Sequence, residues 1–236
     1  RDKWLNLKFK ARREKPPYSY LADGIVEPTD TEEIQWLVRW AAQNEIFLIP
    51  RGGGSGVCGA AVPNYGGIVV DMSSFLNKIR GIDYKNENIW VESGILGSRI
   101  EKILQAVTPE SHRRYTCGHS PASLDISTPG GWVATRSAGQ FSSIYGTIED
   151  LVLAVEAVNE KGELNVIKGD GLKKFFRMEG ASGIITKVKM KIFPEPPFRQ
   201  FLAFRFDNSA RAMSLAKTFS QLMERRADID PHCVIR

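Results

Sequence analysis

Apolar positions spaced three or four residues apart, from Ile34 to Ala42, predict an amphipathic helix early in the chain. The segment that precedes them, residues 28–33, offers a capping side chain followed by acidic residues, which suit the positive end of a helix dipole. Short apolar runs at residues 46–49 and 68–70 predict two buried strands. This combination of strands and helix favours a small α/β unit.

The same pattern predicts further elements along the chain. Residues 88–92, 151–158 and 184–192 are typical of strands, and the apolar positions from Ile100 to Val107 mark a helix that ends before Pro109. Residues 116–146 are instead rich in Gly, Ser and Thr and show little periodicity. An irregular stretch of roughly 30 residues is uncommon in a compact domain unless it binds something.

Prolines lie near both ends of the segment that holds the predicted strands and helices. Pro16 and Pro17 interrupt a polar N-terminal arm, residues 1–22, and prolines recur at residues 194–197. We therefore expect a domain over residues 23–195, with subdomains at about 23–105 and 106–195. Residues 198–236 predict the beginning of a second domain, with a strand at 201–206, a helix bearing apolar positions from 212 to 223, and the start of a strand at 233–235.

Composition and charge exclude several classes of protein. The 236 residues carry a net charge of +5, and the basic side chains near the N-terminus are typical of a solvated face, so we expect no nucleic-acid partner. No apolar run reaches the roughly 18 residues of a membrane span, and the start lacks a signal-peptide core. Three widely spaced cysteines fit neither a zinc site nor a disulfide framework, which predicts a reduced, cytoplasmic protein without a metal. The oligomeric state stays open, a homodimer included.

A glycine-rich loop, residues 50–56, follows the predicted strand at 46–49. Consecutive glycines lose much entropy on folding, and their bare amide groups can form an anion-binding nest. Gly54, Gly56 and Gly59 also fit the dinucleotide-binding GxGxxG pattern, with Asp71 imitating its acidic residue. That motif must open a helix, and no helix fits before the strand at 68–70, so we interpret the loop as a phosphate-binding loop of another kind.

Two further blocks combine hydroxyl side chains with glycines. Residues 119–139 hold a hydroxyl run, a glycine pair and Arg136, and residues 179–186 place a glycine turn before a strand. Backbone and hydroxyl donors of this kind suit a polar, phosphate-bearing ligand. Ser/His/Asp hydrolase chemistry has no support, because no GxSxG elbow occurs.

In this order and spacing, the three blocks resemble the FAD domain of the vanillyl-alcohol-oxidase (PCMH-type) family. The resemblance covers residues ~20–195 and is strongest to the branch of alkyldihydroxyacetonephosphate synthase, glycolate oxidase and D-lactate dehydrogenase. The residues on which the resemblance rests are 118–119, 123–124, 127–128, 130–133, 135–136 and 145–152. The family implies an α+β fold in which two subdomains enclose FAD, followed by the start of a second, ferredoxin-like α+β substrate domain.

The resemblance also implies cofactor-binding residues. The glycine loop would hold the FAD pyrophosphate through Pro50, Arg51, Gly52, Gly53, Gly54, Ser55 and Gly56. The flavin and ribityl wall would comprise Ser123, Leu124, Asp125, Ile126, Ser127 and Thr128, with Gly130 and Gly131, and would continue through Thr135, Arg136, Ser137 and Ala138. The adenosine end would be closed by Glu179, Gly180, Gly183, Ile184 and Ile185. Residues 177–183 depart from the usual family pattern. The hydroxyl side chain in this run, that of Ser182, lies one position away from the hydroxyl residue of the pattern.

The expected activity is FAD-dependent oxidation of a small 2-hydroxy acid, of the D-lactate or glycolate kind, with hydride passing to flavin N5 and electrons leaving to an unidentified acceptor. The alternatives are a synthase-like exchange of acyl for alkyl without net redox, and a flavin-carrying subunit of an electron-transfer complex. We expect FAD to be bound non-covalently, and we assign no catalytic residue because substrate-contacting groups in this family come mostly from the second domain.

Three side chains keep two interpretations each. His119 is a catalytic base, or a structural or flavin-wall histidine. Arg136 meets phosphate or flavin carbonyls, or pairs with Glu149 or Asp150. Trp132 belongs to the core or stacks on the cofactor.

Overall fold

The computed structural model describes residues 21–196, 198 and 203–226. They form two compact units, which divide between Phe193 and Pro194, next to the proline-rich segment. The predicted N-terminal arm, apart from its last two residues, and the predicted strand at 233–235 lie outside the described residues. The candidate site lies entirely in the first unit.

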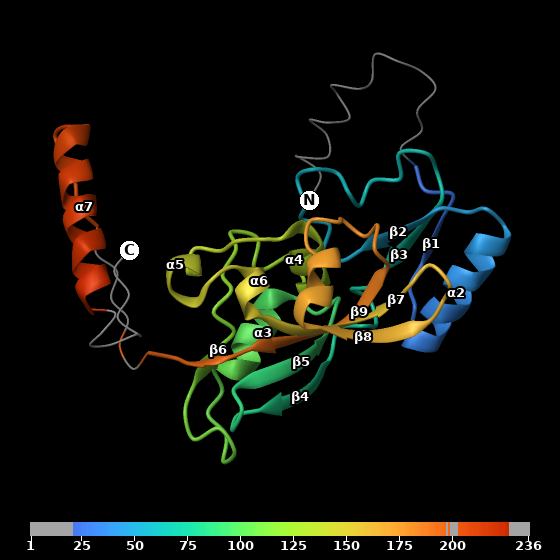
Figure 1. Ribbon diagram of the computed structural model, residues 1–236, viewed down its shortest axis with the longest axis horizontal. Coiled ribbons are helices and arrows are strands. Elements are labelled where there is room, and N and C mark those ends of the chain that lie inside the picture. Colours follow the sequence, from blue (N-terminus) through green and yellow to red (C-terminus); the bar gives the residue numbers. More distant parts are fainter. Residues whose placement is uncertain (1–20, 197, 199–202, 227–236) are drawn as a thin grey trace. The chain divides into compact units, whose positions relative to one another are not determined.

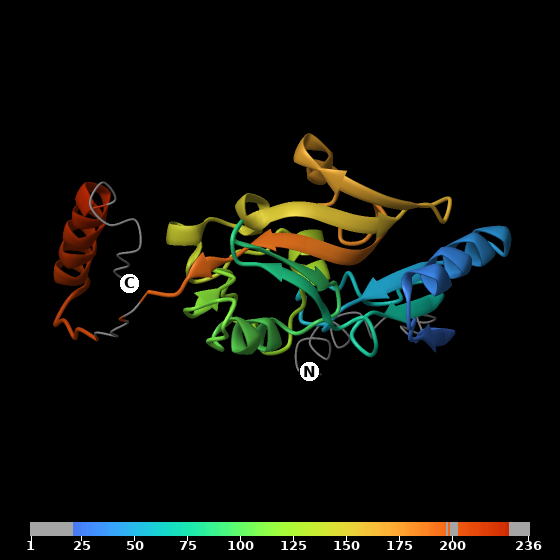
Figure 2. The same ribbon diagram turned by 90° about the horizontal axis from the view of Figure 1, so that it is seen from below.

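The first part of this unit is a three-stranded parallel sheet with one helix. β1 (Gly24–Val26), β3 (Ile68–Asp71) and β2 (Leu48–Arg51) lie in that order, and α2 (Thr31–Gln43) lies beside them in both views (Figures 1 and 2). The Asp30 side chain accepts a hydrogen bond of 2.9 Å from Glu33 N, and α2 buries Ile34, Leu37, Val38 and Ala41. The predicted helix, its cap and the small α/β unit are confirmed.

β2 begins two residues later than the apolar run predicts and continues into the glycine loop. Ile46 N donates to Ala41 O at 2.9 Å, which ties Ile46 to the end of α2, and Phe47 is exposed. Pro50 and Arg51 pair with Val70 and Asp71 and therefore belong to the strand. The glycines start at the point where β2 ends.

The second part is a five-stranded antiparallel sheet. Its order is β4 (Ile79–Asp83), β5 (Asn88–Glu92), β9 (Ile184–Lys191), β7 (Val152–Val158) and β8 (Leu164–Lys168). α3 (Gly97–Leu104) lies beside β4 and β5 (Figure 1). The remaining short elements are β6 (Tyr115–Thr116), α5 (Ser142–Tyr145), α6 (Ile148–Leu151), the 3₁₀ helix η1 (Gly169–Lys174) and β10 (Phe193–Pro194).

This sheet carries the larger hydrophobic core. Ile89 and Val91 of β5, Ile100 of α3, and Val155 and Val188 of the central strands are all fully buried in it. The strands predicted at 88–92, 151–158 and 184–192 are confirmed, within one residue at their ends. The mixed helix and sheet fold agrees with the α+β class expected from the sequence.

Residues 116–146 contain a helix that the sequence pattern does not predict. α4 (Pro129–Thr135) begins with a proline and two glycines, which periodicity does not recognise as helical. A Cβ on Gly130 would lie 2.8 Å from Ser93 Cβ, so only glycine lets the helix approach the end of β5 this closely. Tertiary packing of Trp132 and Val133, both buried, therefore outweighs poor intrinsic propensity.

The second unit contains α7 (Ser209–Arg226), which agrees with the predicted apolar helix. The predicted strand at 201–206 is wrong for the part that the structure describes, because residues 203–206 have no strand pairing. The Phe204 ring instead packs 6.0 Å from that of Phe219 on α7. Within the described ranges, no helix has both the length and the apolar character needed to cross a bilayer.

Candidate cofactor-binding site

A cavity of about 740 Å³ opens where the glycine loop, the segment around α4 and the turn at 179–183 meet. This volume falls in the range of ligand sites, roughly 300–1,000 Å³. Most of the residues predicted to hold the cofactor line it: Pro50, Arg51, Gly52, Gly53, Gly54, Ser55, Gly56, Ser123, Ile126, Ser127, Thr128, Gly130, Gly131, Thr135, Ser137, Ala138, Glu179, Gly180, Gly183 and Ile185. The structure thus brings the three predicted blocks together.

Four of the predicted residues do not line this cavity. Asp125 is exposed, and Ile184 is buried in the core of the first part of the unit. Arg136 ends α4 in the left-handed conformation with φ 53°, and its Nε donates to Glu149 Oε2 at 2.5 Å. In the structure Arg136 therefore forms an ion pair with Glu149, one of the two contacts expected for it, and it does not line the cavity.

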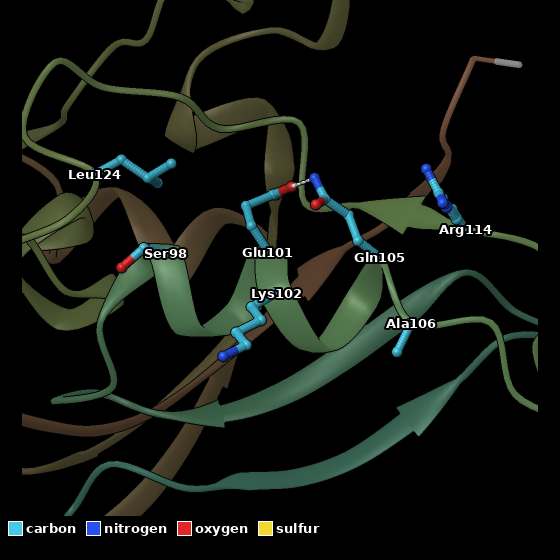
Figure 3. A pocket seen from close by; sticks show the side chains of 7 residues that line it. All are labelled: Ser98, Glu101, Lys102, Gln105, Ala106, Arg114 and Leu124. Atoms are coloured by element: carbon cyan, nitrogen blue, oxygen red, sulfur yellow. Dashed lines mark hydrogen bonds between the residues drawn. The ribbon is translucent and has the colours of Figure 1, made fainter. Parts of the chain in front are cut away.

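Leu124, the fourth, lines a separate and shallower pocket of about 430 Å³ beside α3. Figure 3 shows it beside α3, which carries Ser98, Glu101 and Lys102. The backbone of the segment is held there, because Ser98 N donates to Leu124 O at 3.2 Å. Leu124 therefore lies outside the cavity wall, although its neighbour Ser123 lines it.

Several lining residues escape prediction from the sequence. They are Val57, Cys58, Ala60, Ala61, Met72, Ser93, Pro121, Ala122 and Ala134. Met72 and Ser93 directly follow β3 and β5, so the end of a buried strand is the signal that could have found them. Trp132 was predicted to belong to the core or to stack on the cofactor; it is 2% exposed in the core and also forms part of the cavity wall.

Two glycines of the loop, Gly52 and Gly53, are required for its close packing against the hydroxyl-rich segment. A Cβ on Gly53 would lie 1.6 Å from Ile126 O, and one on Gly52 would lie 2.2 Å from Thr128 Oγ1. Of the four loop glycines, Gly54 alone has a positive φ, 67°. The loop therefore lies directly on the hydroxyl-rich segment, and backbone rather than side chains faces the cavity.

An ion pair with Asp71 holds the positively charged side chain of Arg51 next to the loop. Arg51 Nη1 donates to Asp71 Oδ2 at 2.5 Å, and Asp71 Oδ1 accepts from Ser73 N and Ser73 Oγ at 2.9 and 2.6 Å. A Cβ on Gly54 would lie 3.0 Å from Arg51 Nη2, so the guanidinium is in contact with the loop. No helix follows Gly59 before β3, which agrees with rejecting the GxGxxG interpretation.

Two buried hydroxyl groups in the cavity wall lack partners. Ser93 Oγ and Thr128 Oγ1 make no hydrogen bond within the described part of the chain, and both residues line the cavity. An unsatisfied buried polar group costs about 1–3 kcal/mol. Together with the side-chain-free glycine loop and the charge of Arg51, they fit a bound molecule that carries phosphates and many hydrogen-bonding atoms.

His119 lies behind this wall rather than in it. The side chain is 1% exposed, its Nε2 lies 2.6 Å from Ser137 Oγ, and its ring meets Trp132 edge-on at 4.7 Å. Burial lowers the pKa of His119 from 6.5 to about 4. The imidazole is therefore neutral at pH 7, and it contacts two residues of the cavity wall, Ser137 and Trp132.

We expect His119 to make the protein less stable in mild acid. Because its pKa is lower in the folded state, the unfolded chain binds more protons between pH 6.5 and 4, and stability falls as the pH falls through this window. The full effect is on the order of 3 kcal/mol. Urea denaturation at several pH values should show this slope reduced in His119→Phe but kept in His112→Asn, whose histidine is exposed. Equal slopes in wild type and His119→Phe would contradict it.

Comparison with known proteins identifies the cofactor. Residues 22–168 match the family described as FAD binding domain. The chain belongs to this FAD-binding family. It is 34% identical over 200 residues to alkyldihydroxyacetonephosphate synthase of Caenorhabditis elegans, covering 80% of this chain and 32% of that protein. It is 27% identical over 217 residues to glycolate oxidase subunit GlcD of Bacillus subtilis, covering 88% and 44%.

A solved structure of an alkyldihydroxyacetonephosphate synthase has the same fold, with a TM-score of 0.63 and 32% identity over 74% of this chain and 32% of the synthase. The PCMH-type resemblance is confirmed, and FAD is the cofactor of this oxidoreductase family. The chain spans between about a third and a half of the length of these relatives.

Proposed function

We propose that this chain is the FAD-binding part of an enzyme that oxidises a small 2-hydroxy acid. Two observations support the proposal: a cavity with a bare glycine loop and unpartnered hydroxyls, and the likeness to a glycolate oxidase subunit, whose name specifies a 2-hydroxy acid. Bound FAD would supply a hydride acceptor at flavin N5. The protein side chains described here would bind and orient it.

Each wall of the cavity suits one part of the cofactor. The backbone of residues 52–56, with Arg51 held by Asp71, would bind the pyrophosphate. Ser93 and Thr128 would direct their free hydroxyls to the flavin half, and the turn at Glu179–Gly183 would close over the adenosine half. We assign no catalytic residue, because the one buried histidine in the described part of this unit, His119, does not line the cavity.

Two other functions stay candidates on specific observations. The greater identity to alkyldihydroxyacetonephosphate synthase, in sequence and in structure, favours an exchange of acyl for alkyl without net redox. The likeness to a glycolate oxidase subunit favours a flavin carrier in a larger electron-transfer assembly. Since these relatives share the cofactor domain, the domain itself does not distinguish their chemistry.

An anaerobic titration separates these functions. If the proposal holds, glycolate or D-lactate bleaches the visible absorbance band of the FAD-loaded protein. If no 2-hydroxy acid bleaches it and an acyl-dihydroxyacetone phosphate perturbs the spectrum, the synthase function replaces it. A spectrum that changes only when a partner protein delivers electrons favours the carrier.

We expect the flavin to be bound without a covalent bond. No histidine lines the cavity among the described residues, although Cys58 does. Acid precipitation of the yellow protein should therefore leave the colour in the supernatant. Colour in the pellet would contradict this, and its loss in Cys58→Ser would identify the attachment point.

A further inference from the structure

His119 makes a contact that packing alone does not explain. Its imidazole is buried between the edge of Trp132 and the hydroxyl of Ser137, where an apolar ring would avoid the cost of burying two polar nitrogens. One nitrogen, Nε2, lies 2.6 Å from Ser137 Oγ, and the other, Nδ1, has no partner in the described part of the chain. Ser137 is the neighbour of this histidine that reaches the cavity wall with a hydroxyl.

The unpartnered nitrogen indicates where the ring carries its proton. A neutral imidazole has one N–H donor and one bare acceptor. Orphaned buried N–H groups are rarer in proteins than under-satisfied acceptors, so Nδ1 is assigned as the bare nitrogen and Nε2 as the donor. Nε2–H then donates to Ser137 Oγ, and the proton of the serine hydroxyl cannot point back to the ring.

We propose that His119 is a positioning residue that turns the Ser137 hydroxyl into a hydrogen-bond donor to FAD. The inference rests on FAD occupying the cavity that Ser137 lines. FAD presents only acceptor atoms on its phosphates and on the carbonyl groups of its ring, so a hydroxyl whose proton is directed into the cavity matches it. The hydroxyl of Thr135 is different, because it already donates to Gly131 O at 2.8 Å.

The local backbone holds Ser137 in place for this role. Arg136 ends α4 in the left-handed conformation and pairs with Glu149, and Ser137 N donates to Trp132 O at 2.9 Å. The position of Ser137 therefore does not depend on His119. What the histidine controls is the direction of the serine proton.

The test measures the dissociation constant of FAD from the apo-protein by fluorescence quenching, in Ser137→Ala, His119→Phe, the double variant and His119→Gln. We expect Ser137→Ala to weaken binding by about tenfold, the effect of one hydrogen bond. His119→Phe should weaken binding by a smaller factor, and the double variant should bind FAD no more weakly than Ser137→Ala. His119→Gln should bind FAD as wild type does, because the amide nitrogen of glutamine can replace the Nε2–H donor of the imidazole. Ser98→Ala, outside the cavity, serves as the control.

The outcomes separate this inference from the proposed site. If wild type binds FAD and Ser137→Ala binds equally well, the inference is overturned while the site stands. Independent, additive losses in the double variant, or no rescue by His119→Gln, also overturn it, because His119 would then act only through packing. If Ser137→Ala and Gly53→Val both leave FAD affinity unchanged, the cavity itself is not the FAD site.

Discussion

Gly53→Val should abolish FAD binding, with a loss of affinity of at least about 100-fold. A Cβ at this position would lie 1.6 Å from Ile126 O and 2.8 Å from Ile126 C, and neither backbone atom can move aside cheaply. The loop would have to leave the hydroxyl-rich segment and take its amide groups away from the cavity. Its φ is not positive, so the clash alone drives the effect.

Equilibrium titration of the apo-protein with FAD measures this loss, and circular dichroism reports whether the fold remains. Gly81→Ala is the matched control, since a Cβ at Gly81, on the edge strand β4, meets no atom within 4 Å. Wild-type affinity in a folded Gly53→Val protein would show that the loop does not contact FAD.

Trp132→Ala should cause the largest loss of stability among single changes in the site, about 3–5 kcal/mol. The ring is 2% exposed and contacts His119 edge-on, its Nε1 donates to Ser127 Oγ at 2.8 Å, and Gly97 is a glycine because the ring occupies the space of its Cβ. Removing the ring leaves an empty space in the main core and removes the hydrogen bond that holds Ser127 in the wall of the cofactor cavity.

Urea denaturation gives the free energy of unfolding for this comparison. Trp132→Phe keeps part of the apolar contact but loses the hydrogen bond to Ser127 and some ring volume, so we expect a smaller loss of about 1–2 kcal/mol. If Trp132→Ala costs no more than Trp132→Phe, the ring does not support the core in the way described.

The elements with strong local signals are those that the sequence predicts. α2 has a cap and four buried apolar positions in register, and β5 and β9 are buried on both faces of the sheet, so their apolar character is visible in the chain itself. β4 and β8 are edge strands with mostly exposed or half-exposed residues, and little in the sequence distinguishes them from loops. α4 is a helix only because Trp132 and Val133 pack against the sheet.

The residues of the site likewise fall into those with a local signal in the sequence and those without one. Its glycines and hydroxyls lie in three compact blocks, and a resemblance to a known family is enough to name them. The contribution of Ser93 and Met72 depends on where β5 and β3 end in space, which no local pattern shows. Arg136 was expected at the cofactor or in an ion pair, and in the structure its guanidinium pairs with Glu149.

A crystal structure of the FAD complex would show whether the cofactor occupies this cavity. We expect the pyrophosphate oxygens within hydrogen-bonding distance of the backbone nitrogens of residues 52–55, and FAD atoms as the missing partners of Ser93 Oγ and Thr128 Oγ1. FAD bound elsewhere on the protein, or bound in this cavity with both hydroxyls still unpartnered and no phosphate at the glycine loop, would contradict it.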